Sequence, residues 1–197
     1  MKYAAIDIGN VCIAIDRTAP LREMGLPADT TFSAEMIDFI RQLEFGIINE
    51  NEFFQLLSGI PACKGLSRNK LMELYDSILR APVPGMKELL TELPELGVMP
   101  VFFSDISTFH LAGSYKRMPE MQLFEGIFSF NYGAYKPSKI MFDAFEQKYG
   151  KPIIYTDDRA ELIEGALANN WNAHCFVSAE ILRKQIIQAI ENFEEIL

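Results

Sequence analysis

The feature that most constrains this chain is a short, almost wholly apolar run at residues 3–6, which ends at Asp7. Such a run is typical of a central strand in a parallel sheet, because both faces of that strand are buried. Gly9 and Asn10 follow and indicate a tight turn. Ligands of open α/β sheets bind at the carboxyl ends of the strands. Asp7 is therefore a candidate functional residue, although a single aspartate at such a place is more often a turn cap.

Apolar segments and helical patterns alternate over the second half of the chain. The sequence predicts strands at 99–103, 126–130, 152–155 and 173–177, with amphipathic helical patterns between them. Strands that alternate with helices favour the α/β class with a doubly wound parallel sheet.

Residues 17–81 differ from the rest of the chain. Their apolar residues recur at helical spacing, as in Met36, Ile40 and Leu43, and no convincing strand pattern interrupts them. Residues 12–16 remain apolar and are expected to form a short hairpin or flap. We therefore predict an α/β core domain made of residues 1–16 and 82–197, with an all-helical domain of residues 17–81 inserted into it.

Charge and cysteine content exclude several classes of function. The 197 residues carry a formal net charge of −9, which would repel nucleic acid and anionic membrane surfaces. The three cysteines are scattered, without metal-ligand spacing or a disulfide framework. The first apolar run is too short for a signal peptide or a membrane span. We expect a cytoplasmic protein, monomeric or homodimeric, that acts on a small molecule.

Polar residues follow three of the predicted strands, namely Asp7, Ser104 and the pair Asp157 and Asp158. Parallel strands share one carboxyl edge, so these side chains are expected to converge, and Lys136 can reach them from a loop. Three carboxylates in one pocket repel each other and need a cation. An all-oxygen site of this kind suits Mg²⁺.

This set of residues suits phosphoryl transfer. A bound Mg²⁺ would let Asp7 stay ionised next to an anionic phosphate, while Lys136 neutralises Asp7 or a phosphoryl oxygen. Ser104 and the backbone N–H groups of the turn at Asn10 could bind the other oxygens. Asp7 would then act as a nucleophile and form an aspartyl-phosphate that water later cleaves.

The ordered motifs AAIDIGNV, VFFSDIS, GAYKPSKIMF and IIYTDDRAELIEGA resemble the signature of the haloacid dehalogenase-like (HAD) superfamily, over nearly the whole chain. The resemblance implies a Rossmann-like core with a helical cap, and a magnesium-dependent phosphatase. It further implies the Gly9 carbonyl as a second metal ligand, Asp158 as a direct ligand, and Asp157 as a ligand directly or through water. Asp7 would be both nucleophile and ligand. The phosphoryl group would lie against Asn10, Ser104, Asp105 and Lys136.

Three positions depart from the family pattern. Gly9 stands where a second aspartate usually acts as general acid and base, and Asp16 is a candidate substitute for proton transfer. Asp105 stands where asparagine is usual and adds a negative charge near the phosphate. Leu162 replaces an asparagine often found after the acidic pair.

The segment LEFGIINENEF resembles a cap motif of small sugar-phosphate phosphatases. Glu44, Phe45 and Gly46 within it are candidates for substrate choice, and a small phosphorylated metabolite such as a sugar phosphate is the expected substrate. The alternative is a weakly active or inactive protein of the same fold that binds phosphate or a partner. A signalling receiver domain ranks last, because its acidic pair lies on the first strand. A dehalogenase is not expected, because dehalogenation would not explain why the acidic pair Asp157 and Asp158 requires a metal ion.

Overall fold

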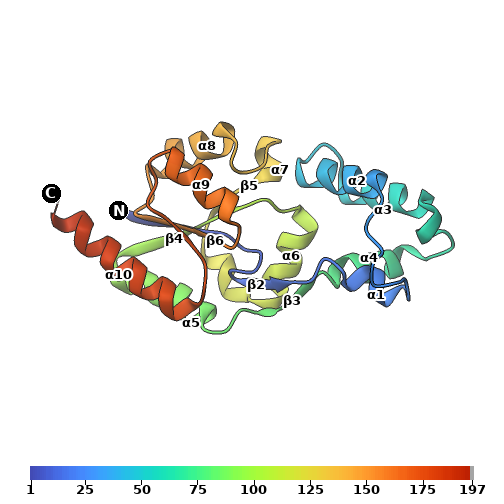
Figure 1. The fold of residues 1–197 in the computed structure, drawn as a ribbon, viewed down its shortest axis with the longest axis horizontal. Helices are drawn as coiled ribbons and strands as arrows, with labels where there is room; N and C mark the ends of the chain where they lie inside the picture. Colours follow the sequence, from blue (N-terminus) through green and yellow to red (C-terminus); the bar gives the residue numbers. More distant parts are fainter. Residues whose placement is uncertain (196–197) are drawn as a thin grey trace.

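The computed structural model describes residues 1–195 and consists of an α/β part with a smaller helical part at one end (Figure 1). Within these residues the central sheet has five strands in the order β5-β4-β1-β6-β7, and all neighbouring strands are parallel. This confirms the doubly wound parallel sheet. Its strands are β1 (Lys2–Ile6), β4 (Val98–Ser104), β5 (Gly126–Phe128), β6 (Ile154–Asp157) and β7 (Ala173–Cys175).

The register of the central strands places their ends at one edge. Ile6, the last residue of β1, lies opposite Phe102 of β4 and Thr156 of β6. Strand β4 then ends at Ser104 and β6 at Asp157, one or two residues further on. The residue that follows β1, Asp7, therefore lies between these two polar ends.

Both faces of the sheet are covered by helices. Ala4 and Ile6 belong to one buried cluster and Ala5 to another, as the alternation of side chains along a strand requires. The first cluster includes residues of α5 (Met86–Glu92), α6 (Thr108–Arg117) and α10 (Ala179–Glu195). The second includes residues of α8 (Lys139–Tyr149) and α9 (Ala160–Ala168). Two short 3₁₀ helices, Leu93–Leu96 and Pro119–Leu123, complete this part.

The helical part has its own apolar cluster, which includes Leu43, Phe53, Phe54 and Tyr75. It consists of α1 (Ala19–Glu23), α2 (Ala34–Glu44), α3 (Glu50–Gly59), a 3₁₀ turn (Pro61–Cys63) and α4 (Arg68–Asp76). The chain leaves the α/β part through β2 (Ile13–Ile15) and returns through β3 (Leu79–Pro82), and these two strands pair antiparallel. Figure 1 shows the pair running between the two parts.

Two elements differ from the sequence expectations. Strand β3 was not predicted as a strand, because only its first residue, Leu79, is buried and no alternating pattern results. The predicted strand at 126–130 stops at Phe128, and α7 (Ser129–Tyr132) follows. The Ser129 hydroxyl accepts a hydrogen bond from the Ile106 N–H and donates one to the Glu44 carbonyl, and these contacts hold the chain in a turn. Among the described helices, none combines the length and the hydropathy that crossing a membrane requires.

Candidate active site

The turn after β1 presents Asp7 at the edge of the sheet. The Cys12 and Ile13 N–H groups both donate to the Ile8 carbonyl, and the Asn10 N–H donates to the Ile13 carbonyl. Asn10 has a φ of 54°, a left-handed conformation that asparagine tolerates better than most residues. The turn therefore folds back tightly and leaves the Asp7 side chain 10% exposed at its base.

Lys136 is the central cation of the site, and its side chain is completely buried. Its Nζ donates to Asp7 Oδ1 at 2.8 Å, to Asp157 Oδ2 at 2.6 Å and to the Phe103 carbonyl at 2.7 Å. All three N–H bonds of the ammonium group are thus used within the protein. Lys136 joins the ends of β1, β4 and β6.

Burial and charge act in opposite directions on the two carboxylates that Lys136 binds. Burial raises the pKa of Asp7 to about 6, against the attraction of the Lys136 ammonium. Burial also disfavours ionised Asp157, but the Lys136 charge and hydrogen bonds outweigh it and hold the pKa of Asp157 below its ordinary value. The Tyr155 hydroxyl and the Arg159 N–H also donate to Asp157, at 2.6 and 3.0 Å. Asp157 is thereby the firmly ionised member of the pair.

The oxygen atoms of Asp7, Asp157 and Asp158 fit a hard divalent cation. Each of these residues offers one carboxylate oxygen, and the three atoms lie within 4.8 Å of one another. Asn10 Nδ2 donates to Asp158 Oδ2 at 2.8 Å and so orients that carboxylate. Among the described residues, none donates a backbone hydrogen bond to the Gly9 carbonyl. The donor set is all oxygen, as Mg²⁺ prefers, and Lys136 alone does not neutralise three carboxylates.

Ser104 and Asp105 lie beside this cluster, but the Asp105 carboxylate is occupied within the protein. Asp105 Oδ1 accepts from the Lys136 backbone N–H at 2.9 Å, and Oδ2 accepts from Arg159 at 2.9 Å. The Asp105 side chain thus positions Lys136 and Arg159, while Asp105 also lines the cavity, so its contact with a phosphoryl group stays a prediction. Ser104 is buried at the end of β4 and lines the cavity above Asp7.

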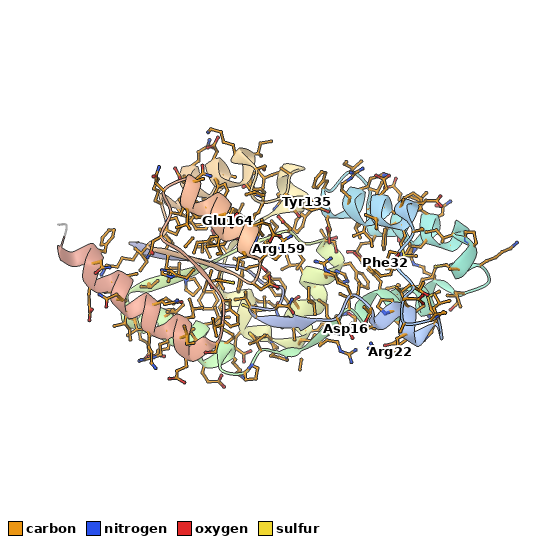
Figure 2. The ribbon with its side chains drawn as sticks, in the orientation of Figure 1. Asp16, Arg22, Phe32, Tyr135, Arg159 and Glu164 are labelled. Atoms are coloured by element: carbon orange, nitrogen blue, oxygen red, sulfur yellow. The ribbon has the colours of Figure 1, made fainter. Side chains whose placement is uncertain are left out.

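A cavity of about 390 Å³ opens over the cluster, between the sheet edge and the helical part. This volume falls in the range of roughly 300–1,000 Å³ that small-molecule sites occupy. Its polar residues include Asp7, Asn10, Ser104, Asp158 and Arg159 from the sheet edge. Its walls toward the helical part are largely apolar: they include Ile13, Ile15, Phe32, Ile37, Ile40, Ile78 and Leu79. In Figure 2, Tyr135 and Arg159 lie between the two parts, with Phe32 on the helical side.

The three candidates for substrate choice are placed differently. Glu44, the last residue of α2, lines the cavity, and Tyr135 donates to its Oε2 at 2.5 Å. Phe45 instead packs edge-on against the Tyr135 ring, with 4.4 Å between ring centroids. Gly46 lies against the backbone of Phe130 and is not among the residues that line the cavity. Only Glu44 can therefore touch a ligand directly.

Asp16 is not among the residues that line the cavity, so the structure argues against the predicted acid and base role. Its Oδ1 accepts from the Thr18 hydroxyl at 2.6 Å, and its Oδ2 accepts from Arg22 at 2.8 Å. These hydrogen bonds hold the pKa of Asp16 below its ordinary value. Figure 2 shows Asp16 close to Arg22, at the start of the helical part. A carboxylate that is fixed as an anion outside the site cannot exchange protons with a substrate.

Arg159 and Tyr135 belong to the site and were missed by the sequence interpretation. Arg159 directly follows the acidic pair, and Tyr135 directly precedes Lys136. Their position next to predicted site residues was the signal that could have identified them. Arg17, Tyr75 and His110 also line the cavity. Nothing in the spacing of these three residues indicated that they would meet there.

No family model matches this chain, and no curated protein matches it. Several solved structures, however, have a similar fold. BT-2542, a HAD family enzyme from Bacteroides thetaiotaomicron, has a TM-score of 0.78 and 19% identity over 90% of this chain and 94% of its own. A predicted HAD-like family hydrolase from Porphyromonas gingivalis has a TM-score of 0.75 and 17% identity, over 96% of this chain and 98% of its own.

A more distant likeness is to the L-2-haloacid dehalogenase of Xanthobacter autotrophicus, whose structure has chloropropionic acid covalently bound. It has a TM-score of 0.62 and 13% identity, over 95% of this chain and 83% of its own. These likenesses agree with the resemblance that the four sequence motifs carry. The chain has the fold of the HAD family enzymes.

Proposed function

We propose that this protein is a HAD superfamily hydrolase that uses Mg²⁺ to cleave the phosphate monoester of a small metabolite. The observation that carries the proposal is the buried Asp7 carboxylate, held by Lys136 within 4.8 Å of ligand oxygens of Asp157 and Asp158. The structure of BT-2542 in complex with magnesium and inorganic phosphate, on a similar fold, supports it.

The charges of the site explain why a cation and a phosphate would bind together. Asp7, Asp157 and Asp158 carry three negative charges when ionised, and Lys136 supplies one positive charge among them. When bound to these carboxylates, and to the Gly9 carbonyl, Mg²⁺ would supply the missing positive charge and polarise a phosphoryl oxygen. Arg159 and Ser104 line the same cavity and can bind the remaining phosphoryl oxygens.

Asp7 is the residue placed to act as nucleophile. Lys136 holds its Oδ1 at 2.8 Å, and Asp7 lines the cavity, so a carboxylate oxygen can attack a phosphoryl group bound there. Attack on phosphorus forms an aspartyl-phosphate, and the ester oxygen leaves with the electron pair of the broken bond and takes up a proton. Water then attacks the same phosphorus, loses a proton, and releases phosphate and the Asp7 carboxylate.

We propose that residues 17–81 act as a cap over a core of residues 1–16 and 82–197. Helix α2 supports this role, because Ile37, Ile40 and Glu44 on it line the cavity above the sheet edge. A cap that closes over the site excludes water from the reacting phosphate. The apolar residues of the cavity also favour an ester whose leaving group carries apolar surface, while a sugar phosphate remains within the proposed class.

A second candidate function is phosphate binding without turnover. Gly9 favours it, because the turn has no side chain at this position to protonate a leaving group. Dehalogenation is disfavoured although dehalogenases share the fold, because halide departure needs no cluster of three carboxylates to hold a cation.

The deciding experiment is release of inorganic phosphate from p-nitrophenyl phosphate and from a panel of metabolite esters, with Mg²⁺ and with EDTA. We expect turnover that needs Mg²⁺ and that Asp7→Asn abolishes. Asp143→Asn is the matched control, because the Asp143 side chain on α8 is 46% exposed and, among the described residues, pairs only with Lys139. Unchanged activity in Asp7→Asn would exclude Asp7 as the nucleophile. Binding of Mg²⁺ and phosphate without turnover of any ester would establish the second candidate instead.

A further inference from the structure

The leaving group of the proposed reaction needs a proton donor, and the turn after Asp7 offers none. Gly9 has no side chain, and Asp16 is fixed by Thr18 and Arg22 outside the cavity. The side-chain candidates for the donor are therefore the other titratable groups that line the cavity.

Most of the titratable groups in the cavity are unsuited to this task. Asp105 is bound through both oxygens, to Lys136 and Arg159. Burial lowers the pKa of His110 to about 4, so its ring is neutral at pH 7, and its Nε2 lies 3.0 Å from the Tyr75 carbonyl as a donor. Burial also raises the pKa of Tyr75 far above neutrality. None of these groups can exchange a proton readily near pH 7.

Glu44 differs from these groups in its position and its contacts. Its backbone carbonyl accepts from the Ser129 hydroxyl at 2.7 Å, which ties the end of α2 to the sheet side of the cavity. Its Oε2 accepts from the Tyr135 hydroxyl at 2.5 Å. Among the described residues, none donates a hydrogen bond to Oε1. One carboxyl oxygen is thus fixed while the other is left for a ligand.

The surroundings of Glu44 adjust its affinity for a proton. Burial raises the pKa of Glu44 to about 7, with a smaller contribution from Asp105 in the same direction. The Tyr135 hydrogen bond and the charges of Arg17 and Arg159 act against it. A carboxyl group of this kind is present in both protonation states near neutral pH. This property is needed in a group that first donates a proton and later accepts one.

We propose that Glu44 is the general acid and base of the reaction and replaces the side chain that Gly9 lacks. This inference rests on the proposed function. In the first step Asp7 attacks phosphorus, the phosphorus–oxygen ester bond breaks, and Glu44 gives its proton to the departing oxygen, which leaves as an alcohol. In the second step water attacks the aspartyl-phosphate, and its proton goes to the Glu44 carboxylate as the bond to Asp7 breaks.

The test is a series of esters of similar size whose leaving groups differ in basicity: p-nitrophenyl, phenyl and benzyl phosphate. A basic leaving group needs the proton most. Glu44→Gln, which keeps the size and an acceptor for Tyr135, should therefore lose little kcat/KM on p-nitrophenyl phosphate. On benzyl phosphate it should lose about 10²- to 10⁴-fold, the usual contribution of general acid catalysis. Glu35→Gln is the matched control, because Glu35 is exposed at the start of the same helix.

A second variant tests the same idea without removing the carboxyl group. Tyr135→Phe deletes a hydrogen bond that favours ionised Glu44, so the alkaline limb of the kcat/KM profile for benzyl phosphate should move to higher pH. An equal loss on all three esters in Glu44→Gln, or an unmoved limb in Tyr135→Phe, overturns the role of Glu44 and leaves the proposed function standing. Failure of the wild-type protein to turn over these three esters and every ester of the metabolite panel overturns both.

Discussion

Replacing Lys136 with Met removes the ammonium group that joins three strand ends and keeps most of the side-chain volume. It leaves Asp7 and Asp157 buried without their shared cation, and the Phe103 carbonyl without its donor. Removing one partner of a buried ion pair costs about 3–5 kcal/mol, because the other charge stays buried without compensation. For a chain of this size, each kcal/mol lowers the melting temperature by roughly 2–4 °C. Lys136→Met should therefore melt roughly 6–20 °C below the wild-type protein at pH 8.

The assay is urea unfolding followed by circular dichroism, without divalent cations, at several pH values. Without the ammonium group the pKa of Asp7 rises further above that of the unfolded chain, and the pKa of Asp157 is no longer held below it. Both buried carboxyl groups of the variant therefore become neutral as the pH falls. The difference in unfolding free energy between variant and wild type should accordingly shrink between pH 8 and pH 5. Lys139→Met is the control, since Lys139 is 80% exposed in its pair with Asp143 and exposed pairs contribute about 0–1 kcal/mol. Similar losses in the two variants, or a loss independent of pH, would refute the reasoning.

Two further predictions concern His110 and Gly46. The pKa of His110 lies at about 4, below that of an unfolded histidine, so its contribution to stability is present above pH 6.5 and is lost as the pH falls toward 4. His110→Gln should remove about 3 kcal/mol of this pH dependence in urea unfolding, and an unchanged pH profile would contradict it. Gly46 has a φ of 67°, and an added Cβ would lie 2.3 Å from the Phe130 carbonyl oxygen. Gly46→Ala should therefore lower the unfolding free energy by about 2 kcal/mol more than Gly25→Ala, whose φ of 71° is similar but whose Cβ would meet open space; equal losses would exclude the clash.

The central sheet and its functional edge could be predicted because the signals are local and strong. The apolar run before Asp7, and the one before Ser104, identify buried parallel strands, and such strands share an edge. The approach of Asp7, Ser104 and Asp157 follows from that geometry alone. Lys136 is not on a strand, and the prediction that it lies in the site depended on the resemblance of its motif to a known family.

The contacts that complete the site could not be predicted in this way. Arg159 binds Asp105 across 54 positions, and Tyr135 binds Glu44 across 91 positions. All four residues lie in loops or at helix ends, where periodicity does not encode the direction of a side chain. Asp16 was misplaced for the opposite reason, because a local signal was overlooked. Thr18 lies two positions after it, at the start of α1, and such spacing favours a local hydrogen bond over a free carboxylate.

The separation of Asp7 from Glu44 has a consequence for how the protein would work. Asp7 belongs to the sheet edge and Glu44 to the helical part, so both can touch one substrate only while the two parts are in contact. Side-chain hydrogen bonds contribute to that contact, from Tyr135 and Ser129 to Glu44 and from Thr108 to Glu50. Each such bond contributes about 0.5–1.5 kcal/mol net, which is small enough for the cavity to open and release product. Because Gly9 cannot supply the proton and Glu44 belongs to the cap, proton transfer would depend on closure of the cap.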